Sequence, residues 1–166
     1  MENLQEFITQ YGYIAIFLLL SLGIIGLPIP DEVLMTFVGY LCSQGVLLYS
    51  VAVLVAFLGA MFGMSFSYFV GKKLGKPLLW KYGKWLKLTP KRLAKVEGWF
   101  QKYGIWTVVF GYYVPGVRHL TCYLAGVTGI ETRKYLLFAG FGAIIWCTVF
   151  ITVGYYIGTI DFMKAR

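Results

Sequence analysis

Two long apolar runs dominate the hydrophobic pattern of the chain. Residues 46–70 contain no charged residue, and residues 135–158 form a second uncharged run of similar length. A helix needs about 20 apolar residues to cross a bilayer, so each run predicts a transmembrane helix. Gly59 and Gly63 in the first run have the spacing of small residues that lets helices pack closely.

A shorter apolar segment, broken by proline, comes before each long run. Residues 11–27 are apolar and end at Pro28 and Pro30, after which residues 31–45 resume; residues 103–130 repeat this arrangement around Pro115 and Gly116. Proline interrupts a helix, so each segment predicts a re-entrant hairpin that enters and leaves the membrane by one face. Irregular backbone at that depth must be covered by protein or line a water-filled cavity.

The two halves match without a gap when the chain is shifted by 87 residues. The matched pairs are Pro28 with Pro115, Asp31 with Arg118, Glu32 with His119, Gly39 with Gly126, Tyr68 with Tyr155 and Gly71 with Gly158. One hairpin and one crossing per copy give the copies opposite orientations, as in many secondary transporters. We therefore predict an all-α membrane protein with one domain (1–166), an inverted repeat of residues 11–71 and 103–158 joined by a basic amphipathic loop at 72–102. If residues 11–27 and 103–117 cross fully instead, the repeats are parallel.

The connecting loop is strongly basic. No Lys or Arg occurs in residues 1–71, whereas residues 72–102 hold ten against the single acid Glu97. This excess is typical of a cytoplasmic loop and does not predict a nucleic-acid partner. Leu93, Val96 and Phe100 recur at helical spacing after Thr89-Pro90, so a short amphipathic helix is expected on the membrane surface. If this loop is cytoplasmic, two hairpins place both termini outside the cell, whereas full spans place both termini in the cytoplasm. Lys164 and Arg166 near the C-terminus favour the cytoplasmic placement.

Composition supports a membrane protein and excludes several other classes. The chain is 59% hydrophobic and 13% charged, against about 25% charged residues in soluble domains. Glu2 and Glu6 stand where a signal peptide would carry Lys or Arg, so no cleavable signal peptide is predicted. Three scattered cysteines (Cys42, Cys122 and Cys147) fit neither a disulfide set nor a metal site and are expected to be buried. There is no nucleotide-binding motif, so we expect no cofactor, and transport that is downhill or ion-coupled.

Ionisable residues within the apolar segments are the candidates for chemistry: Asp31, Glu32, Arg118 and His119. Each costs about 3 kcal/mol at membrane depth, so such residues usually mark a site. We predict that the acidic pair of one tip faces the Arg-His pair of the other. Arg118 would bind a phosphate, Asp31 or Glu32 would take a proton or contact a cationic headgroup, and His119 is a candidate proton relay. The alternative is a buried ion pair that only holds the hairpins together.

The ordered set of these motifs resembles the DedA family, also called SNARE-associated or VTT-domain proteins. The motifs are Pro28–Glu32, Gly39, Gly59–Gly63, Tyr68–Gly71, Pro115–Arg118, Ala125-Gly126, Trp146 and Gly154-Tyr155. The resemblance covers nearly the whole chain. It implies a multi-pass protein of the bacterial cytoplasmic membrane, with two re-entrant hairpins that face each other and a role in moving lipids between leaflets, as a flippase or scramblase. It also implies dependence on the proton-motive force in several members, and it matches the family's functional glutamate and arginine to Glu32 and Arg118.

Two departures from the family pattern bear on the substrate. Met64 and Tyr112 stand where the family often has an Asp and an Arg. Their joint replacement leaves a less charged pocket, which Tyr112 is expected to line, and argues against strong proton coupling. It favours phosphatidylethanolamine, with its phosphate at Arg118 and its ammonium at Glu32 or Asp31.

The sequence also leaves open functions besides that of a phosphatidylethanolamine transporter. They are an undecaprenyl phosphate flippase, a proton-coupled small-ion exporter, an assembly factor and, as an enzyme, a membrane lipid phosphatase. We expect a transporter, not an enzyme, and no metal site. The sequence leaves open the transported lipid, the direction of transport, the coupling ion and the oligomeric state, including a homodimer.

Overall fold

All elements of the computed structural model are helices in the residues that it describes, 2–25, 31–82, 90–111, 113 and 118–164. In chain order they are α1 (Glu2–Ile25), α2 (Asp31–Ser43), α3 (Tyr49–Tyr82), α4 (Pro90–Tyr103), α5 (Trp106–Gly111), α6 (Arg118–Val127) and α7 (Thr132–Lys164). The predicted all-α class is therefore confirmed for the described part of the chain.

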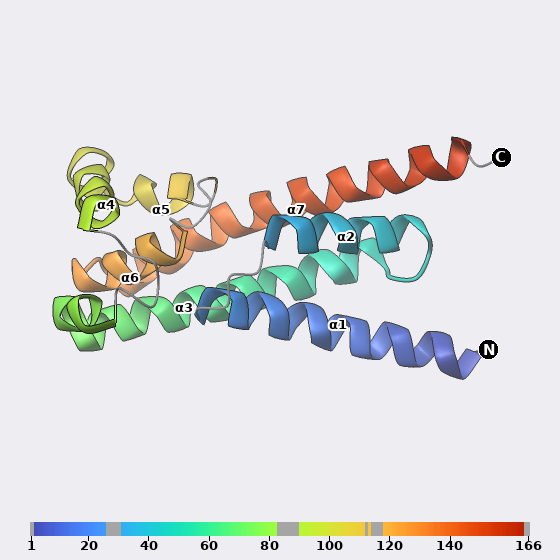
Figure 1. Cartoon of the computed structure of the whole chain (residues 1–166), viewed down its shortest axis with the longest axis horizontal. Coiled ribbons are helices and arrows are strands. Elements are labelled where there is room, and N and C mark those ends of the chain that lie inside the picture. The colour runs from blue at the N-terminus through green and yellow to red at the C-terminus, as the bar shows by residue number, and fades with distance from the viewer. Residues whose placement is uncertain (1, 26–30, 83–89, 112, 114–117, 165–166) are drawn as a thin grey trace.

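The two predicted spans are the long helices α3 and α7, which run in opposite directions along the molecule (Figure 1). Tyr49–Gly75 and Thr132–Ile160 are long and apolar enough to cross a membrane, whereas the apolar part of α1, Tyr11–Leu22, is shorter. The first stretch starts and ends later than the predicted run 46–70, and the second extends beyond 135–158 at both ends. Buried alanines and aromatic side chains along α3 and α7 form the centre of the core, because small residues let these helices approach closely.

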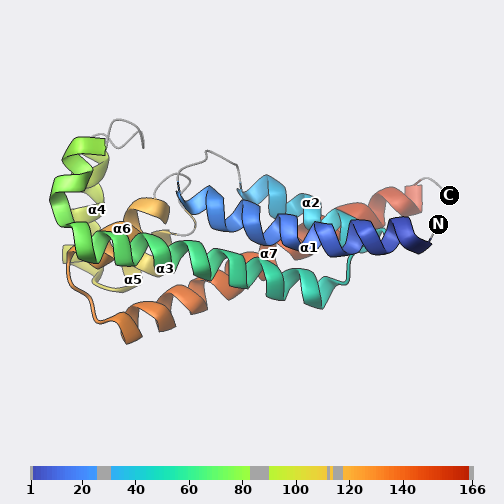
Figure 2. The ribbon, with the colours of Figure 1, turned by 90° about the horizontal axis from the view of Figure 1, so that it is seen from below.

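The shorter helices stop midway along the molecule. Figures 1 and 2 show α1 running inward from one end and α2 returning to that end, while α5 and α6 do the same from the opposite end. The first residues of α2 and α6 are thereby brought together in the middle. Each returning helix packs mainly on the long helix of the other half, α2 on α7 and α6 on α3.

Glycines allow these two helix pairs to touch backbone to backbone. A methyl group on Gly39 would lie 2.0 Å from the carbonyl oxygen of Ile151 in α7, and one on Gly126 would lie 2.1 Å from that of Tyr68 in α3. No side chain fits at such distances. Gly39 and Gly126 are also a matched pair under the 87-residue shift, so the same kind of contact occurs once in each half.

The two halves of the chain differ in the segment of the second half that corresponds to α1. Under the same shift α1 matches residues 89–112, and the described part of that range holds two helices, α4 and α5, rather than one. Gly104 has φ +58°, and its amide donates a 2.9 Å hydrogen bond to the carbonyl oxygen of Phe100, as at the end of a helix. Phe17 stands at the equivalent place in α1, and it does not favour this left-handed conformation.

The predicted amphipathic helix exists as α4, which lies across the long axis of the molecule (Figure 2). Its buried Val96, with Trp99 and Phe100, packs on Leu120 and Leu124 of α6. The helix therefore covers α6, whose first residue is Arg118.

Two glycine substitutions in this region have opposite expected effects. Gly104→Ala should destabilise the protein by about 1–2 kcal/mol, because alanine is disfavoured at positive φ. Gly98→Ala, in the interior of α4, should stabilise it by up to about 1 kcal/mol. An added methyl group meets nothing within 4 Å at either site, so only backbone conformation differs. Thermal unfolding in detergent measures the stability of both variants. Equal effects would contradict the positive φ of Gly104.

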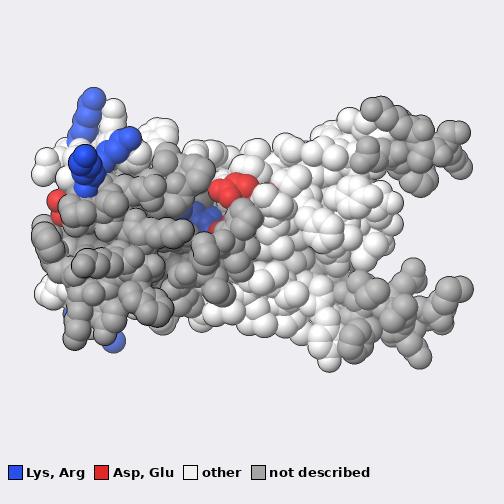
Figure 3. Space-filling model, in the orientation of Figure 1, with Lys and Arg blue, Asp and Glu red and all other residues white. Residues whose placement is uncertain are grey.

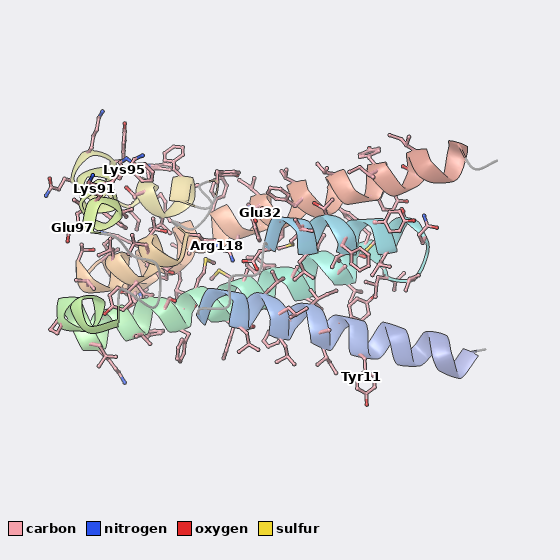
Figure 4. The ribbon with its side chains drawn as sticks, in the orientation of Figure 1. Tyr11, Glu32, Lys91, Lys95, Glu97 and Arg118 are labelled. Carbon is pink, nitrogen blue, oxygen red and sulfur yellow. The ribbon has the colours of Figure 1, made fainter. Side chains whose placement is uncertain are left out.

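The stretch predicted as a loop at residues 72–102 is largely helical. The chain leaves the axis of α3 at Gly75 (φ 60°, ψ −161°) and continues as helix to Tyr82. Lys91 and Lys95 are exposed on α4 (Figure 4). Figure 3 shows basic side chains gathered at this end of the molecule, opposite the start of α1 and the end of α7. Lys95 lies 5.4 Å from the Trp99 ring centre, an arrangement suited to a headgroup region.

Cys42, Cys122 and Cys147 are buried, as predicted, and each is a free thiol in the described structure. Among the described residues that were searched, no three His, Cys, Asp or Glu side chains gather as metal ligands.

Candidate functional site

The starts of α2 and α6 hold a buried ion pair. A guanidinium nitrogen of Arg118 (Nη2) donates a hydrogen bond to Oδ2 of Asp31, and the two residues are only 5% and 4% exposed. Figure 4 shows Arg118 midway along the molecule, near the start of α2. A buried charge without a partner is strongly unfavourable, so each of these residues needs the other in this structure.

Trp146 of α7 holds the guanidinium from a second direction. The Cζ atom of Arg118 lies 4.5 Å from the centre of the Trp146 ring, within the range of a cation–π contact. Trp146 is fully buried. The motif set included Trp146 but assigned it no role. Its position was the available signal, because tryptophan in membrane proteins favours the interfaces and this one lies in the interior of a span.

Asp31 is not fully satisfied by Arg118. Its second oxygen, Oδ1, is buried and has no hydrogen-bond partner in the part of the chain that the structure describes. A buried acceptor without a donor is costly, and such groups in native structures call for an explanation. The ion pair therefore uses only part of the hydrogen-bonding capacity of the carboxylate.

Glu32 faces an apolar groove beside this pair. The groove has a volume of about 400 Å³ and is lined by Glu32, Val33, Thr36, Phe37 and Tyr40 of α2 and by Gly154 and Ile157 of α7. Val33 and Phe37 are 64% and 56% exposed. Glu32 is the one charged residue of this lining. The structure thus separates the two adjacent carboxylates, with Asp31 on Arg118 and Glu32 on the groove.

Several candidate residues are not described by the structure. Pro28, Pro30, Tyr112, Pro115 and Gly116 lie outside the described residues. His119 is the second residue of α6, but its side chain is also outside them. The tip prolines, the proton relay and the role of Tyr112 therefore stay predictions.

Comparison with known proteins assigns the family. The VTT domain matches residues 29–156. This chain belongs to the DedA family of VTT-domain membrane proteins. The resemblance drawn from the motifs is confirmed. The match includes α2, α3, α6 and most of α7, and so both members of the ion pair.

Three relatives indicate how this DedA-family protein compares with others. It is 52% identical over 160 residues to the uncharacterized membrane protein YbfM of Bacillus subtilis, covering 96% of this chain and 99% of the relative. It is 30% identical over 159 residues to undecaprenyl phosphate transporter A of B. subtilis, covering 96% of this chain and 78% of the relative. It is 30% identical over 162 residues to an alkaline phosphatase-like protein of Lactococcus lactis, covering 95% and 76%. No solved structure matches the chain.

These relatives are bacterial, and two of the three are named as a membrane protein or a transporter. Together with the two spans, they confirm a membrane location, and a bacterial cell membrane is consistent with them.

Proposed function

We propose that this DedA-family protein is a transporter that moves a polyprenyl phosphate lipid between leaflets, with Arg118 as the contact for the phosphate. Undecaprenyl phosphate is the substrate in the name of the B. subtilis relative. The departures at Met64 and Tyr112 favoured phosphatidylethanolamine, but the relatives support a polyprenyl phosphate better. We therefore take the latter as the leading substrate class.

The observation that carries this proposal is a buried arginine at the start of a helix in the middle of the molecule. Arg118 begins α6, a helix of ten residues, and the start of a helix favours an anion through its free amide groups and its dipole. A cation alone is disfavoured there, whereas a cation that binds a phosphate is not. Guanidinium also matches phosphate oxygens in a bidentate geometry.

We further propose that the short helices form two re-entrant hairpins in an inverted repeat. Three observations support this: α1–α2 and α5–α6 enter from opposite ends, α5 has six residues and is too short to cross, and the Gly39 and Gly126 contacts occur once in each half. The positive-inside rule would put the α4 end in the cytoplasm. The start of α1 and the end of α7 would then lie outside.

The groove beside Glu32 is proposed to hold the apolar chain of the lipid. Its lining on α2 runs from Glu32 to Tyr40, which corresponds to about 12 Å along a helix. Its walls are apolar, and the exposed Val33 and Phe37 open it toward the surrounding lipid. A lipid with its phosphate near Arg118 would find an apolar path that starts next to the charged pair.

Filling this groove should slow transport. Val33→Trp places an indole in the groove and should lower the transport rate by about tenfold, equivalent to about 1.4 kcal/mol. Leu137→Trp on α7 is the matched control, because Leu137 is 73% exposed and does not line the groove. Rates measured in liposomes with equal amounts of each variant make the comparison. Equal rates for the two variants would remove the groove from the pathway.

The function itself is tested with the full chain reconstituted in liposomes. Labelled undecaprenyl phosphate or labelled phosphatidylethanolamine is placed in the membrane, and an impermeant reagent reports the label that reaches the outer leaflet. We expect the protein to accelerate transfer of undecaprenyl phosphate at least about tenfold over empty liposomes, and phosphatidylethanolamine much less. Acceleration of phosphatidylethanolamine alone would support the second candidate instead, and acceleration of neither would contradict lipid transport.

The same liposomes test for lipid hydrolysis, proton coupling and dimerisation. The name of the L. lactis relative belongs to that protein, and we propose transport without hydrolysis, so no inorganic phosphate should be released from the lipid. An imposed proton gradient tests proton coupling, and cross-linking at low protein density tests a homodimer.

A further inference from the structure

We propose that Asp31 is an internal competitor that occupies the phosphate site on Arg118 and thereby determines which lipids can bind. This inference rests on the proposed function, because it concerns the same arginine. Such a competitor would give Arg118 a means of excluding the headgroups of bulk phospholipids, which surround any membrane protein in large excess and also carry phosphate.

The geometry makes the Asp31 carboxylate a stand-in for the phosphate. A carboxylate and a phosphate both present oxygens to the N–H groups of a guanidinium. Asp31 presents Oδ2 to Nη2 of Arg118, at the start of α6, where an anion is favoured. A lipid phosphate cannot use the N–H group that Asp31 accepts from until the carboxylate leaves it.

The pair is also built so that it can open. Oδ1 of Asp31 is buried and has no hydrogen-bond partner among the described residues, so within them Arg118 holds the carboxylate through one oxygen and not as a bidentate pair. Bidentate pairs are the stronger ones. An incoming phosphate that bonds more than one N–H group of Arg118 therefore gains contacts that Asp31 does not make.

Arg118 is also held by contacts other than its ion pair with Asp31. Its guanidinium rests 4.5 Å from the Trp146 ring centre, a contact that does not involve Asp31. The hydroxyl of Thr121 donates a 2.7 Å hydrogen bond to the carbonyl oxygen of Arg118, which fixes the first turn of α6. The displaced carboxylate is thus exchanged for another anion on a site that these other contacts help to hold.

This competition favours phosphate monoesters over diesters. A monoester carries a charge of about −1.5 to −2 at neutral pH and three acceptor oxygens, whereas a diester headgroup has less charge and fewer free oxygens. The weaker anion is the one that an occupying carboxylate excludes more effectively. Asp31 is therefore a specificity-determining residue that screens Arg118 from ordinary phospholipids.

The test is Asp31→Asn in the full chain, purified in detergent. Binding of a short-chain prenyl phosphate and of a short-chain phosphatidylethanolamine is titrated for both proteins. We expect the half-saturating concentration of phosphatidylethanolamine to fall about tenfold or more in Asp31→Asn, a factor typical of removing a competing charge. The half-saturating concentration of the prenyl phosphate should fall by a smaller factor, so the preference of the protein for prenyl phosphate over phosphatidylethanolamine becomes smaller. Glu131→Gln, which removes an exposed carboxylate paired with Lys134, should change neither.

Turnover separates competition from a structural role. In liposomes, Asp31→Asn should reach half-maximal transport at a lower lipid concentration yet have a lower maximal rate, because no carboxylate helps to release the phosphate from Arg118. If the variant is unstable alone, prenyl phosphate added during purification should recover folded protein, because it replaces the missing anion. Failure of that rescue, or unchanged or weaker binding by folded Asp31→Asn, would overturn the inference.

Arg118→Met distinguishes this failure from failure of the proposed function. If the unmodified protein binds prenyl phosphate and neither folded Arg118→Met nor the more stable double variant Arg118→Met with Asp31→Asn does, the proposed function stands whatever Asp31→Asn does alone. If the unmodified protein does not bind the lipid, the proposed function fails and the competition fails with it.

Discussion

Replacing Arg118 alone by methionine should destabilise the protein by about 3–5 kcal/mol, because it leaves the Asp31 carboxylate buried without a partner. Replacing both residues, Arg118→Met with Asp31→Asn, should recover most of that loss, since a buried ion pair gains little over neutral groups of similar size. Transport should be abolished in both variants. The two residues touch across 87 positions of sequence, so their effects are expected to be strongly non-additive.

Stability and transport together distinguish a site from a structural pair. A pair that only holds the helices together predicts a double variant that is folded and active, which would contradict the role of Arg118. Unfolding in detergent and transport in liposomes are measured on the same preparations. Lys134→Met is the matched control, because the Glu131–Lys134 pair is exposed and its atoms are 3.4 Å apart. Pairs of that kind contribute about 0–1 kcal/mol.

The second large effect is expected at the contact between α2 and α7. A methyl group at Gly39 would lie 2.0 Å from the carbonyl oxygen of Ile151, and one at Gly154 would lie 1.9 Å from that of Thr36. These neighbours are backbone atoms, so the two helices must separate. Gly39→Ala and Gly154→Ala should each lower the free energy of unfolding by about 1–3 kcal/mol or more, the range typical of overpacking. They should also disturb Asp31 and the groove.

Gly140→Ala in α7, the helix that also holds Gly154, is the control for this prediction. Its nearest neighbour would be the flexible side chain of Met61 at 3.9 Å, and alanine is the better helix former, so no loss is expected. Thermal unfolding and the yield of membrane-inserted protein measure all three variants. If Gly39→Ala were as stable as Gly140→Ala, the close approach of α2 and α7 would be wrong.

Local patterns predicted much of the architecture. The two spans and the amphipathic α4 follow from the length and spacing of apolar residues, which depend on near neighbours in sequence. The break at Gly104 does not follow from such a pattern, because a glycine can also continue a helix, as Gly98 does. Whether it takes a positive φ depends on where α4 and α5 pack. The continuation of α3 beyond Gly75 was missed because a basic stretch was interpreted as a loop.

The sequence by itself determined an all-helical membrane protein of the DedA family, with a small set of ionisable residues in its apolar segments. Apolar length, charge and motif order are enough for that, because each is read along the chain. Only the tertiary structure decided which carboxylate meets Arg118. Asp31 and Glu32 are neighbours in sequence but point in different directions from α2, one toward Arg118 and one toward the groove. The packing of α2 on α7 and of α6 on α3 selects between them, and it also brings Trp146 to the guanidinium.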